Sequence, residues 1–325
     1  MRVLVMGGNR YIGLCLVEEL VRLGHEVTVM NSHAVPYPGS VRRLHGDRQQ
    51  PGVIREVLGP HRDEFDAVFD NTAYVPADLE PMLELFEGRV RHFVFTSSVA
   101  VYRRSFIQPV GESSRRHDPE DPDERKAYGV GKVQCENLLD ARHARTGLPH
   151  TTLRVGHTFG PRSPLVTREP IMFRRMELGR PTLVPGDGFS ALCLVHVRDV
   201  ARSMTAILGN DRAIGRTYNI VGREFASLLG VLELVGRAVG VRPELVHVPM
   251  EVARTIHPPL VHWGEAITGS TVYDITSALD ELEWTPEFGL AEGYADSYRW
   301  FVDGGRELYE YDFSREDELL ARFAR

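Results

Sequence analysis

Three scarcities in this sequence exclude whole classes of protein. Cysteine occurs only as Cys15, Cys135 and Cys193, which are far apart and odd in number, so neither a disulfide framework nor a metal site is predicted. No apolar run is long enough to cross a membrane. The formal net charge of −7 disfavours nucleic acid as a partner. With no signal peptide ahead of its first motif, the chain is expected to be a cytoplasmic globular protein.

Lysine is scarcer still. Of the 38 basic residues, all but Lys126 and Lys132 are arginine. A lysine that persists in such a composition marks a position where arginine will not serve. Lys132 follows Tyr128 by four residues, and on a helix this spacing places both side chains on one face.

The Tyr128–Lys132 pair has the chemistry of an acid/base catalyst. A compact ammonium beside a phenol stabilises the phenolate and is expected to lower the pKa of Tyr128. Such a pair transfers protons near neutral pH. The alternative interpretation is a surface tyrosine and a surface lysine on an ordinary helix.

The N-terminal residues predict a dinucleotide site. A short apolar run at residues 2–6 is typical of a buried strand, and residues 14–23 have helical spacing closed by Gly24. A second strand follows at residues 26–30. Strand, glycine-rich turn, helix and strand in this order bring backbone close to a pyrophosphate at the helix N-terminus. The turn contributes Gly7, Gly8, Asn9, Arg10, Tyr11, Ile12 and Gly13.

The alternation of strands and helices continues through the first half of the chain. It predicts an α/β fold with a doubly wound parallel (Rossmann) sheet. We expect residues 1–160 to form the dinucleotide-binding domain. After about residue 160 prolines become frequent and the pattern loosens. We expect residues 161–325 to form mainly a smaller substrate-binding lobe, with segments near 190–222 returning to the main sheet.

Several ordered motifs together resemble a known family. In this order and spacing, the chain resembles the extended short-chain dehydrogenase/reductase superfamily, in its NAD-dependent epimerase/dehydratase branch. The motifs are the glycine turn, Gly46-Asp47, Thr96-Ser97-Ser98, Tyr128 to Lys132, Gly160-Pro161-Arg162, Pro185-Gly186-Asp187-Gly188, His196-Val197-Arg198-Asp199 and Trp284-Thr285-Pro286.

The resemblance implies roles for individual residues. Ser98 is implied as the catalytic serine, Tyr128 as the acid/base and Lys132 as the lysine that binds the nicotinamide ribose. Beyond the glycine turn, the implied cofactor-binding residues are Asn31, Ser32, Asp47, Arg48, Thr72, Ala73, Thr96 and Lys132. The implied substrate-binding residues are Tyr74, Ser98, Val99, His157 and Arg162.

Two departures from the branch concern the cofactor. Arg10 stands where a third glycine is usual, a form similar to an atypical subgroup that includes chloroplast stem-loop RNA-binding proteins. Asn31 stands where an acid normally binds the adenosine ribose. Without that carboxylate a 2′-phosphate is not repelled, and Arg10 can pair with it, which favours NADP over NAD. The alternative is that Arg10 packs over the adenine or points to solvent.

Two further departures concern the substrate. Ser98-Val99-Ala100 replaces the Thr-Asp-Glu of family dehydratases, so sugar 4,6-dehydration is not expected. His157 replaces an asparagine usual in nucleotide-sugar enzymes, so the substrate is not a nucleotide sugar or is held differently. His157 contacts substrate or is satisfied within its own loop.

The predicted function is hydride transfer at a secondary alcohol or ketone of a small, sugar-like or natural-product molecule. Net reduction and epimerisation both remain open. The alternatives are an RNA-binding or RNA-processing protein and a dinucleotide-sensing regulator. We expect a homodimer that pairs through the helices at 125–145 and 77–87.

Overall fold

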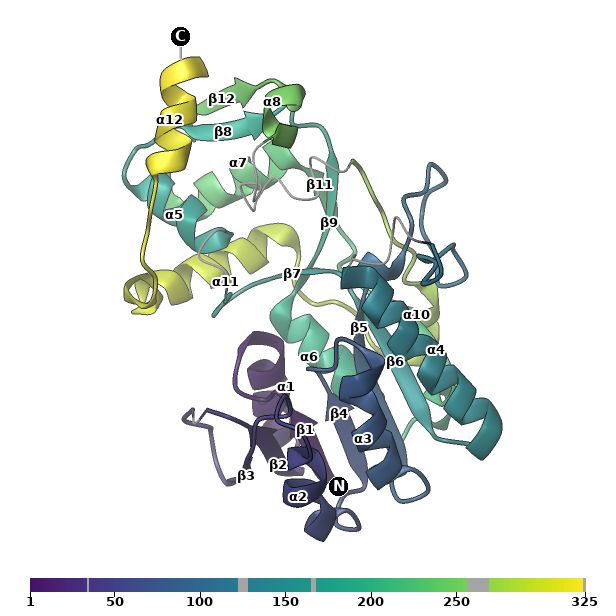
Figure 1. Cartoon of the computed structure of the whole chain (residues 1–325). Coiled ribbons are helices and arrows are strands. Elements are labelled where there is room, and N and C mark those ends of the chain that lie inside the picture. Colours follow the sequence, from purple (N-terminus) through teal and green to yellow (C-terminus); the bar gives the residue numbers. More distant parts are fainter. Residues whose placement is uncertain (34, 122–127, 165–167, 256–268, 324–325) are drawn as a thin grey trace. The chain divides into compact units, whose positions relative to one another are not determined.

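The computed structural model describes residues 1–33, 35–121, 128–164, 168–255 and 269–323 (Figure 1). The chain divides into two compact units, each described here by itself. The first comprises Met1–Gly156, Arg198–Val221 and Tyr273–Thr285, and the second His157–Val197, Gly222–Val272 and Pro286–Arg325. The expected boundary near residue 160 lies close to Gly156. The chain returns to the first unit twice, and the second return was not anticipated.

The first unit is built on a parallel sheet, which confirms the predicted Rossmann fold. Its described strands form one seven-stranded sheet in the order β10-β6-β5-β4-β1-β2-β3. All neighbouring pairs are parallel. The strands are β1 (Arg2–Met6), β2 (Glu26–Asn31), β3 (Val41–His45), β4 (Ala67–Asp70), β5 (His92–Ser98), β6 (His150–Val155) and β10 (Arg216–Ile220). The strand order reverses between β1 and β4, and in such sheets ligands bind at the carboxyl ends beside that reversal.

Helices cover this sheet because each has one apolar face. The described helices of the unit are α1 (Tyr11–Arg22), α2 (Val53–Leu58), α3 (Pro76–Phe86), α4 (Tyr128–Thr146), α6 (Val197–Thr205) and α10 (Thr276–Glu281). Leu79, Leu83 and Phe86 of α3 lie in the same buried cluster as Cys135 and Leu139 of α4. The apolar faces of both helices are therefore used within their own unit.

A buried ion pair fixes α4 to the sheet. Glu136 on α4 accepts two hydrogen bonds from Arg154 on β6, at 3.0 Å from Nε and 2.8 Å from Nη2. Arg116 Nη1 donates to the same carboxylate at 2.7 Å, and Ser97 Oγ on β5 donates at 2.6 Å. Both carboxylate oxygens of Glu136 are thus satisfied in the interior, as a buried charge requires.

The same network continues to the edge of the sheet. Arg154 Nη1 donates to the hydroxyl of Tyr102 at 2.8 Å, and that hydroxyl donates to Asn219 of β10 at 2.7 Å. The Asn219 amide donates in turn to the backbone of Val110 and Asp274. These bonds hold the loop after β5 and the returning segment at Tyr273–Thr285 against the sheet.

The second unit combines small sheets with packed helices. Strands β11 (Phe225–Ser227), β9 (Ala191–His196) and β7 (His157–Phe159) form one sheet, and β12 (Leu245–Val248) pairs with β8 (Thr182–Pro185). Helices α5 (Glu169–Glu177), α7 (Leu228–Val239) and α11 (Leu290–Val302) pack around a core that contains Phe173, Tyr294 and Phe301. The remaining helices are α8 (Met250–Thr255) and α12 (Ser314–Phe323).

Three observations bear on the early expectations. All three cysteines are buried. Strand β3, which carries Arg42 and Arg43 on a parallel edge of the sheet, was not anticipated from the sequence. Across the described ranges, no helix combines the length and apolarity needed to span a bilayer.

Buried histidines at the start of β5 and β6 make the fold sensitive to acid. His92 and His150 are 3% and 1% exposed, and burial lowers the pKa of each to about 4. In the unfolded chain both would bind a proton near pH 6.5. Between these pH values the unfolded state binds more protons, so this stability is complete above about pH 6.5 and is lost as the pH falls towards 4.

We therefore expect the free energy of unfolding to fall by about 2 kcal/mol per buried histidine between pH 7 and pH 5. Urea denaturation of the wild type and of His150→Leu at both pH values measures this change. The variant should lose about 2 kcal/mol less on acidification than the wild type. An equal loss in both proteins would show that His150 does not contribute. His45→Gln, at an exposed position, is the control.

Candidate active site

The glycine-rich turn after β1 has room for backbone only. Gly7 has a φ of +78°, and a Cβ there would lie 2.2 Å from Cγ2 of Thr72. A Cβ on Gly13 would lie 2.0 Å from the backbone oxygen of Gly7. Both glycines are therefore required for the close packing of the turn against α1 and the loop after β4. Such packing lets a ligand approach the backbone at the helix N-terminus.

The N-terminus of α1 is open to an anion. Arg10, its N-cap residue, is extended, with φ −140°, and no side-chain capping hydrogen bond to a described residue is present. The first turn carries no acidic residue. Unsatisfied amides and the helix dipole make such an end favourable for phosphate. Arg10 itself is exposed.

A cavity adjoins this turn. It has a volume of about 180 Å³ and lies entirely within the first unit. It brings together eight of the residues expected to bind cofactor or substrate. These are Gly7, Asn9, Asn31, Ser32, Asp47, Arg48, Thr72 and, among those expected for substrate, Tyr74.

Asn31 is held by groups that the sequence analysis missed. Its amide Nδ2 donates to the hydroxyl of Tyr37 at 2.8 Å, and its Oδ1 accepts from Arg43 Nε at 3.0 Å. Arg43 Nη2 lies 3.2 Å from Nδ1 of His45, the residue paired with Asn31 across β2 and β3. The end of β2 therefore faces a cation and an imidazole. The segment Val41-Arg42-Arg43-Leu44-His45 does not alternate as a half-buried strand does, so the sequence carried no clear signal for it.

Arg48 lines the cavity and binds the residues of the loop after β4. Its guanidinium pairs with Asp70 at 2.6 and 3.1 Å and donates to Thr72 Oγ1 at 2.7 Å and to the backbone oxygen of Asp78. Asp70 Oδ1 also accepts from the backbone amides of Thr72 and Ala73. Arg48 thus orders the loop after β4. The sequence alone did not indicate that its charge is neutralised by Asp70.

Ser98, Tyr128 and Lys132 come together at the carboxyl end of β5. Ser98 is the last residue of β5, and its Oγ accepts from the amide of Ala100 at 3.1 Å. Tyr128 and Lys132 lie on the first turns of α4. The rings of Tyr74 and Tyr128 are 6.1 Å apart. Lys132 Nζ lies 5.0 Å from the ring centre of Tyr74 and 6.0 Å from that of Tyr128, so the expected catalytic residues and Tyr74 are neighbours.

Lys132 is almost completely buried. Its Nζ donates to the backbone oxygens of Ala73 and Thr96, each at 2.7 Å, and lies 4.8 Å from the ring centre of Phe95. Burial lowers the pKa of the ammonium to about 8. The ammonium thereby ties α4 to the ends of β4 and β5, where Thr96 and Ala73 were expected to line the cofactor site.

The pKa of Tyr128 differs from the expectation. Although Tyr128 is about half exposed, partial desolvation of its hydroxyl and the nearby Tyr74 raise its pKa to about 12, against a hydrogen bond with Ser98 that lowers it. Lys132 was expected to lower this pKa, but its ammonium is held by two carbonyl oxygens. At neutral pH Tyr128 is therefore a protonated phenol, suited to donate a proton.

The remaining residues expected to bind cofactor or substrate are divided between the two units. Thr96 Oγ1 donates to Asn71 at 2.6 Å, and Val99 is buried directly after Ser98. Asp47 Oδ1 accepts from the amide of Gln49. His157 and Arg162 belong to the second unit, in which His157 begins β7 and Arg162 is exposed with φ +65°.

A parallel sheet with a glycine-lined turn into α1, and with a serine, a tyrosine and a lysine at its carboxyl edge, defines a Rossmann-type dinucleotide-dependent enzyme. A sequence model of the NAD dependent epimerase/dehydratase family matches residues 3–221. The chain belongs to that family.

Individual relatives extend over most of the chain. The chain is 30% identical to the chloroplast stem-loop binding protein of 41 kDa b of Arabidopsis thaliana, covering 99% of this chain and 84% of that protein. It is 26% identical to the 2'-dehydrokanamycin reductase of Streptomyces kanamyceticus, covering 100% and 91%. The solved UDP-glucose 4-epimerase of Thermotoga maritima, at 21% identity, covers 93% of this chain and 99% of its own with a TM-score of 0.77, which supports the fold.

The burial of Lys132 generates a prediction. Arginine is larger and stays charged, so Lys132→Arg should lower the free energy of unfolding by about 2–4 kcal/mol through overpacking and a poorly solvated charge. Urea denaturation measures the difference. Lys126→Arg, which changes the other lysine of the chain, is the control. A Lys132→Arg protein as stable as the wild type would contradict the tight carbonyl site.

Proposed function

We propose that the first unit binds NADP(H) and that the protein catalyses a reversible alcohol–ketone redox step on a small molecule. The step is a net reduction or a transient oxidation within an epimerisation. The observation that carries the proposal is the meeting of Ser98, Tyr128 and Lys132 beside a glycine-lined cavity in one unit. Bound nicotinamide would supply or accept the hydride.

The residues present fit a dinucleotide. Gly7 and Gly13 leave no room for side chains where backbone must approach the pyrophosphate. The uncapped amides of α1 would bind its charge. Asn31, Ser32 and Asp47 line the part of the cavity that would receive the adenosine.

Support for a 2′-phosphate comes from the end of β2. The residue there is Asn31, not an acid, and Arg43 donates to it at 3.0 Å with His45 beside it. Arg43 and Arg10 would pair with the phosphate, whereas an acid at position 31 would repel it. NAD is the alternative cofactor.

The chain's own groups perform the proton chemistry. Ser98 would orient the substrate oxygen by a hydrogen bond. In reduction, protonated Tyr128 donates its proton to that oxygen, and in oxidation its phenolate accepts one. The pKa of about 12 favours the donating role at neutral pH. Lys132 holds α4 in place and presents its ammonium beside Thr96 and Ala73, where the ribose is expected.

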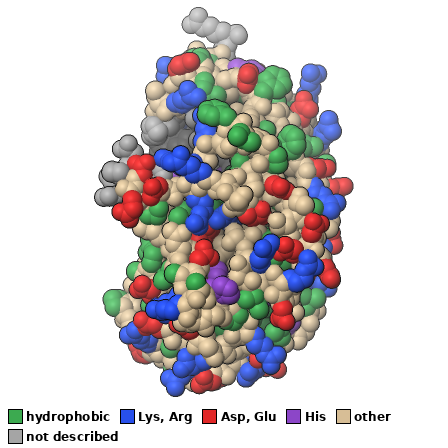
Figure 2. Space-filling model, turned by 90° about the vertical axis from the view of Figure 1, so that its right-hand side faces the viewer, with side chains coloured by type: hydrophobic (Ala, Val, Ile, Leu, Met, Phe, Trp, Pro, Cys, Tyr) green, Lys and Arg blue, Asp and Glu red, His purple; other side chains and the backbone are tan. Residues whose placement is uncertain are grey.

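Stem-loop RNA binding is a second candidate, supported by the name of the Arabidopsis relative. Its electrostatic requirement is a continuous basic surface. On the face drawn in Figure 2, basic and acidic side chains are interspersed. Salt-dependent retention of a stem-loop RNA in a gel assay would favour this candidate.

A homodimer through α3 and α4 completes the proposal. The apolar faces of both helices pack into their own core. The surface that remains for a partner would be formed by the partly buried Pro81, Leu85 and Leu138. We expect light scattering at micromolar concentration to give twice the mass of the chain. The mass of a single chain would contradict this pairing.

The cofactor preference can be tested at Arg43. We expect the wild type to bind NADPH more tightly than NADH, and Arg43→Gln to lower the NADPH affinity by about tenfold while leaving the NADH affinity unchanged. Calorimetric titration measures both. Arg42→Gln is the matched control, since Arg42 lies next to Arg43 on β3 but pairs with Glu64 at 2.6 Å. Tighter binding of NADH by the wild type would contradict the account.

The acid/base role can be tested at Tyr128. Tyr128→Phe should retain NADPH binding but lose turnover by about a hundredfold or more. Because the phenolate fraction rises with pH up to the pKa of about 12, alcohol oxidation by the wild type should accelerate between pH 7 and 9, and ketone reduction should not. Steady-state rates on an identified substrate measure both. Full activity of Tyr128→Phe would assign the proton transfer to another residue.

A further inference from the structure

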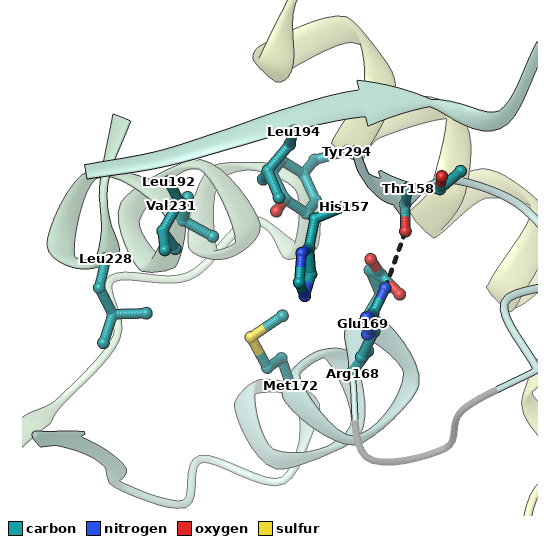
Figure 3. Close-up of a pocket in the computed structure, with 10 residues that line it drawn as sticks. All are labelled: His157, Thr158, Arg168, Glu169, Met172, Leu192, Leu194, Leu228, Val231 and Tyr294. Carbon is teal, nitrogen blue, oxygen red and sulfur yellow. Dashed lines mark hydrogen bonds between the residues drawn. The ribbon is translucent and has the colours of Figure 1, made fainter. Parts of the chain in front are cut away.

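The second unit contains a pocket of its own. Its lining residues come from β7, β9, α5, α7 and α11 and from Arg168 just before α5, and all belong to this unit. Its volume is about 60 Å³, enough for several water molecules or for part of a small ring. Figure 3 shows the polar side chains gathered on one side of the pocket and Leu192, Leu228 and Val231 on the other.

Glu169 is the unusual group at the polar side. It is 5% exposed, and its Oε2 is buried without a hydrogen-bond partner among the residues that the structure describes. Burial raises the pKa of its carboxyl, against opposing effects of Arg168, Ser163 and His157. A buried carboxyl with an unmatched oxygen is costly unless it is protonated or meets a ligand.

A phenol belongs to the same lining. Tyr294 is 2% exposed, and burial raises the pKa of its hydroxyl well above the ordinary value. Tyr294 therefore stays neutral and able to donate a hydrogen bond. Together with Glu169 it offers hydrogen bonds to a ligand without offering it charge.

The charge of the pocket disfavours a diphosphate. Of the ten side chains in Figure 3, Arg168 carries the permanent positive charge, and its Nη1 already donates to the backbone oxygen of Thr158 at 3.0 Å. Glu169 follows it directly and would repel an anion when ionised. A desolvated diphosphate needs more cationic donors than this lining provides.

The opposite wall is apolar. Leu192 and Leu194 of β9, Leu228 and Val231 of α7 and Met172 of α5 line the pocket and belong to one buried cluster. Such a surface offers no hydrogen bonds to water. An apolar edge of a ligand contributes about 25 cal/mol of binding free energy for each Å² that it buries there.

We propose that this pocket receives the apolar edge of a neutral hydroxylated ring, of the deoxysugar class, and that Glu169 and Tyr294 hydrogen-bond its hydroxyls. Calling this ring a part of the substrate rests on the proposed function. The pocket itself does not, since it lies wholly in the second unit.

The test uses methyl α-L-rhamnopyranoside as the neutral probe and UDP as the charged one. Binding of each to the full chain is measured by ligand-observed NMR at probe concentrations up to about 10 mM. Val231→Phe fills the pocket, and Leu234→Phe makes the same kind of change on α7 at a partly buried position outside the lining. Thermal unfolding and NADPH titration of each variant report on folding and on the first unit.

We expect the rhamnoside to bind the wild type and Leu234→Phe, UDP not to displace it, and Val231→Phe to weaken its binding by about tenfold or more. Should Val231→Phe fail to fold, Glu169→Gln decides, because its neutral amide should keep the affinity within about threefold. A loss of about tenfold or more in Glu169→Gln would show that the ligand needs a carboxylate charge and would overturn the proposal.

Two other results would also overturn it. These are UDP binding that Val231→Phe abolishes, and no saturable binding of the rhamnoside to the wild type. Rhamnoside binding without NADPH binding would leave the pocket assignment standing and refute the proposed function. NADPH binding without rhamnoside binding would refute the pocket assignment and leave the proposed function standing.

Discussion

The buried ion pair between Glu136 and Arg154 is the constraint on which the catalytic edge depends. Glu136 lies four residues after Lys132 and eight after Tyr128, so all three share one face of α4. Its carboxylate is bound by Arg154, Arg116 and Ser97 from β6, the loop after β5 and β5 itself. Removing one partner of such a pair leaves a buried charge, at a cost of about 3–5 kcal/mol. The pair therefore fixes both the height and the rotation of α4 over the sheet.

That fixed helix makes the burial of the Lys132 ammonium possible. Two backbone oxygens, of Ala73 and Thr96, accept hydrogen bonds from it at equal distances. One belongs to β5 and the other to the loop after the neighbouring strand β4, so the position of the ammonium depends on how α4 is aligned with both. An arginine at this position would need more space and would keep its charge under all conditions. This explains, in physical terms, why lysine persists here in a chain that otherwise uses arginine.

Much of this could be predicted from local sequence, and the rest depends on distant contacts. The glycine turn and the Tyr128–Lys132 spacing were visible because each is set within a few residues. Strand β3 was missed because its side chains are mostly exposed and it contains Arg42 and Arg43, which look like a loop. The pKa of Tyr128 was given the wrong direction, because the burial of its hydroxyl depends on the tertiary packing.

Other features had no local signal at all. The return of Tyr273–Thr285 to the first unit depends on Asn219, more than fifty residues earlier in the chain. The partner of Arg48 is Asp70, and no short motif joins them. The pocket around Glu169 is assembled from five elements spread over more than one hundred residues. Such sites become apparent only when the burial of each polar atom is known.

The most direct measurement of the central claim is the titration of Lys132, followed by NMR of lysine side chains labelled with ¹³C at Cε. The chain has two lysines, so the spectrum contains two signals, and Lys126→Arg assigns them. The account predicts that Lys132 titrates near pH 8, and that its midpoint stays well below the ordinary value of about 10.4 in Glu136→Gln, because that change removes a carboxylate that raises the pKa of Lys132. A wild-type midpoint already at that ordinary value would contradict the account.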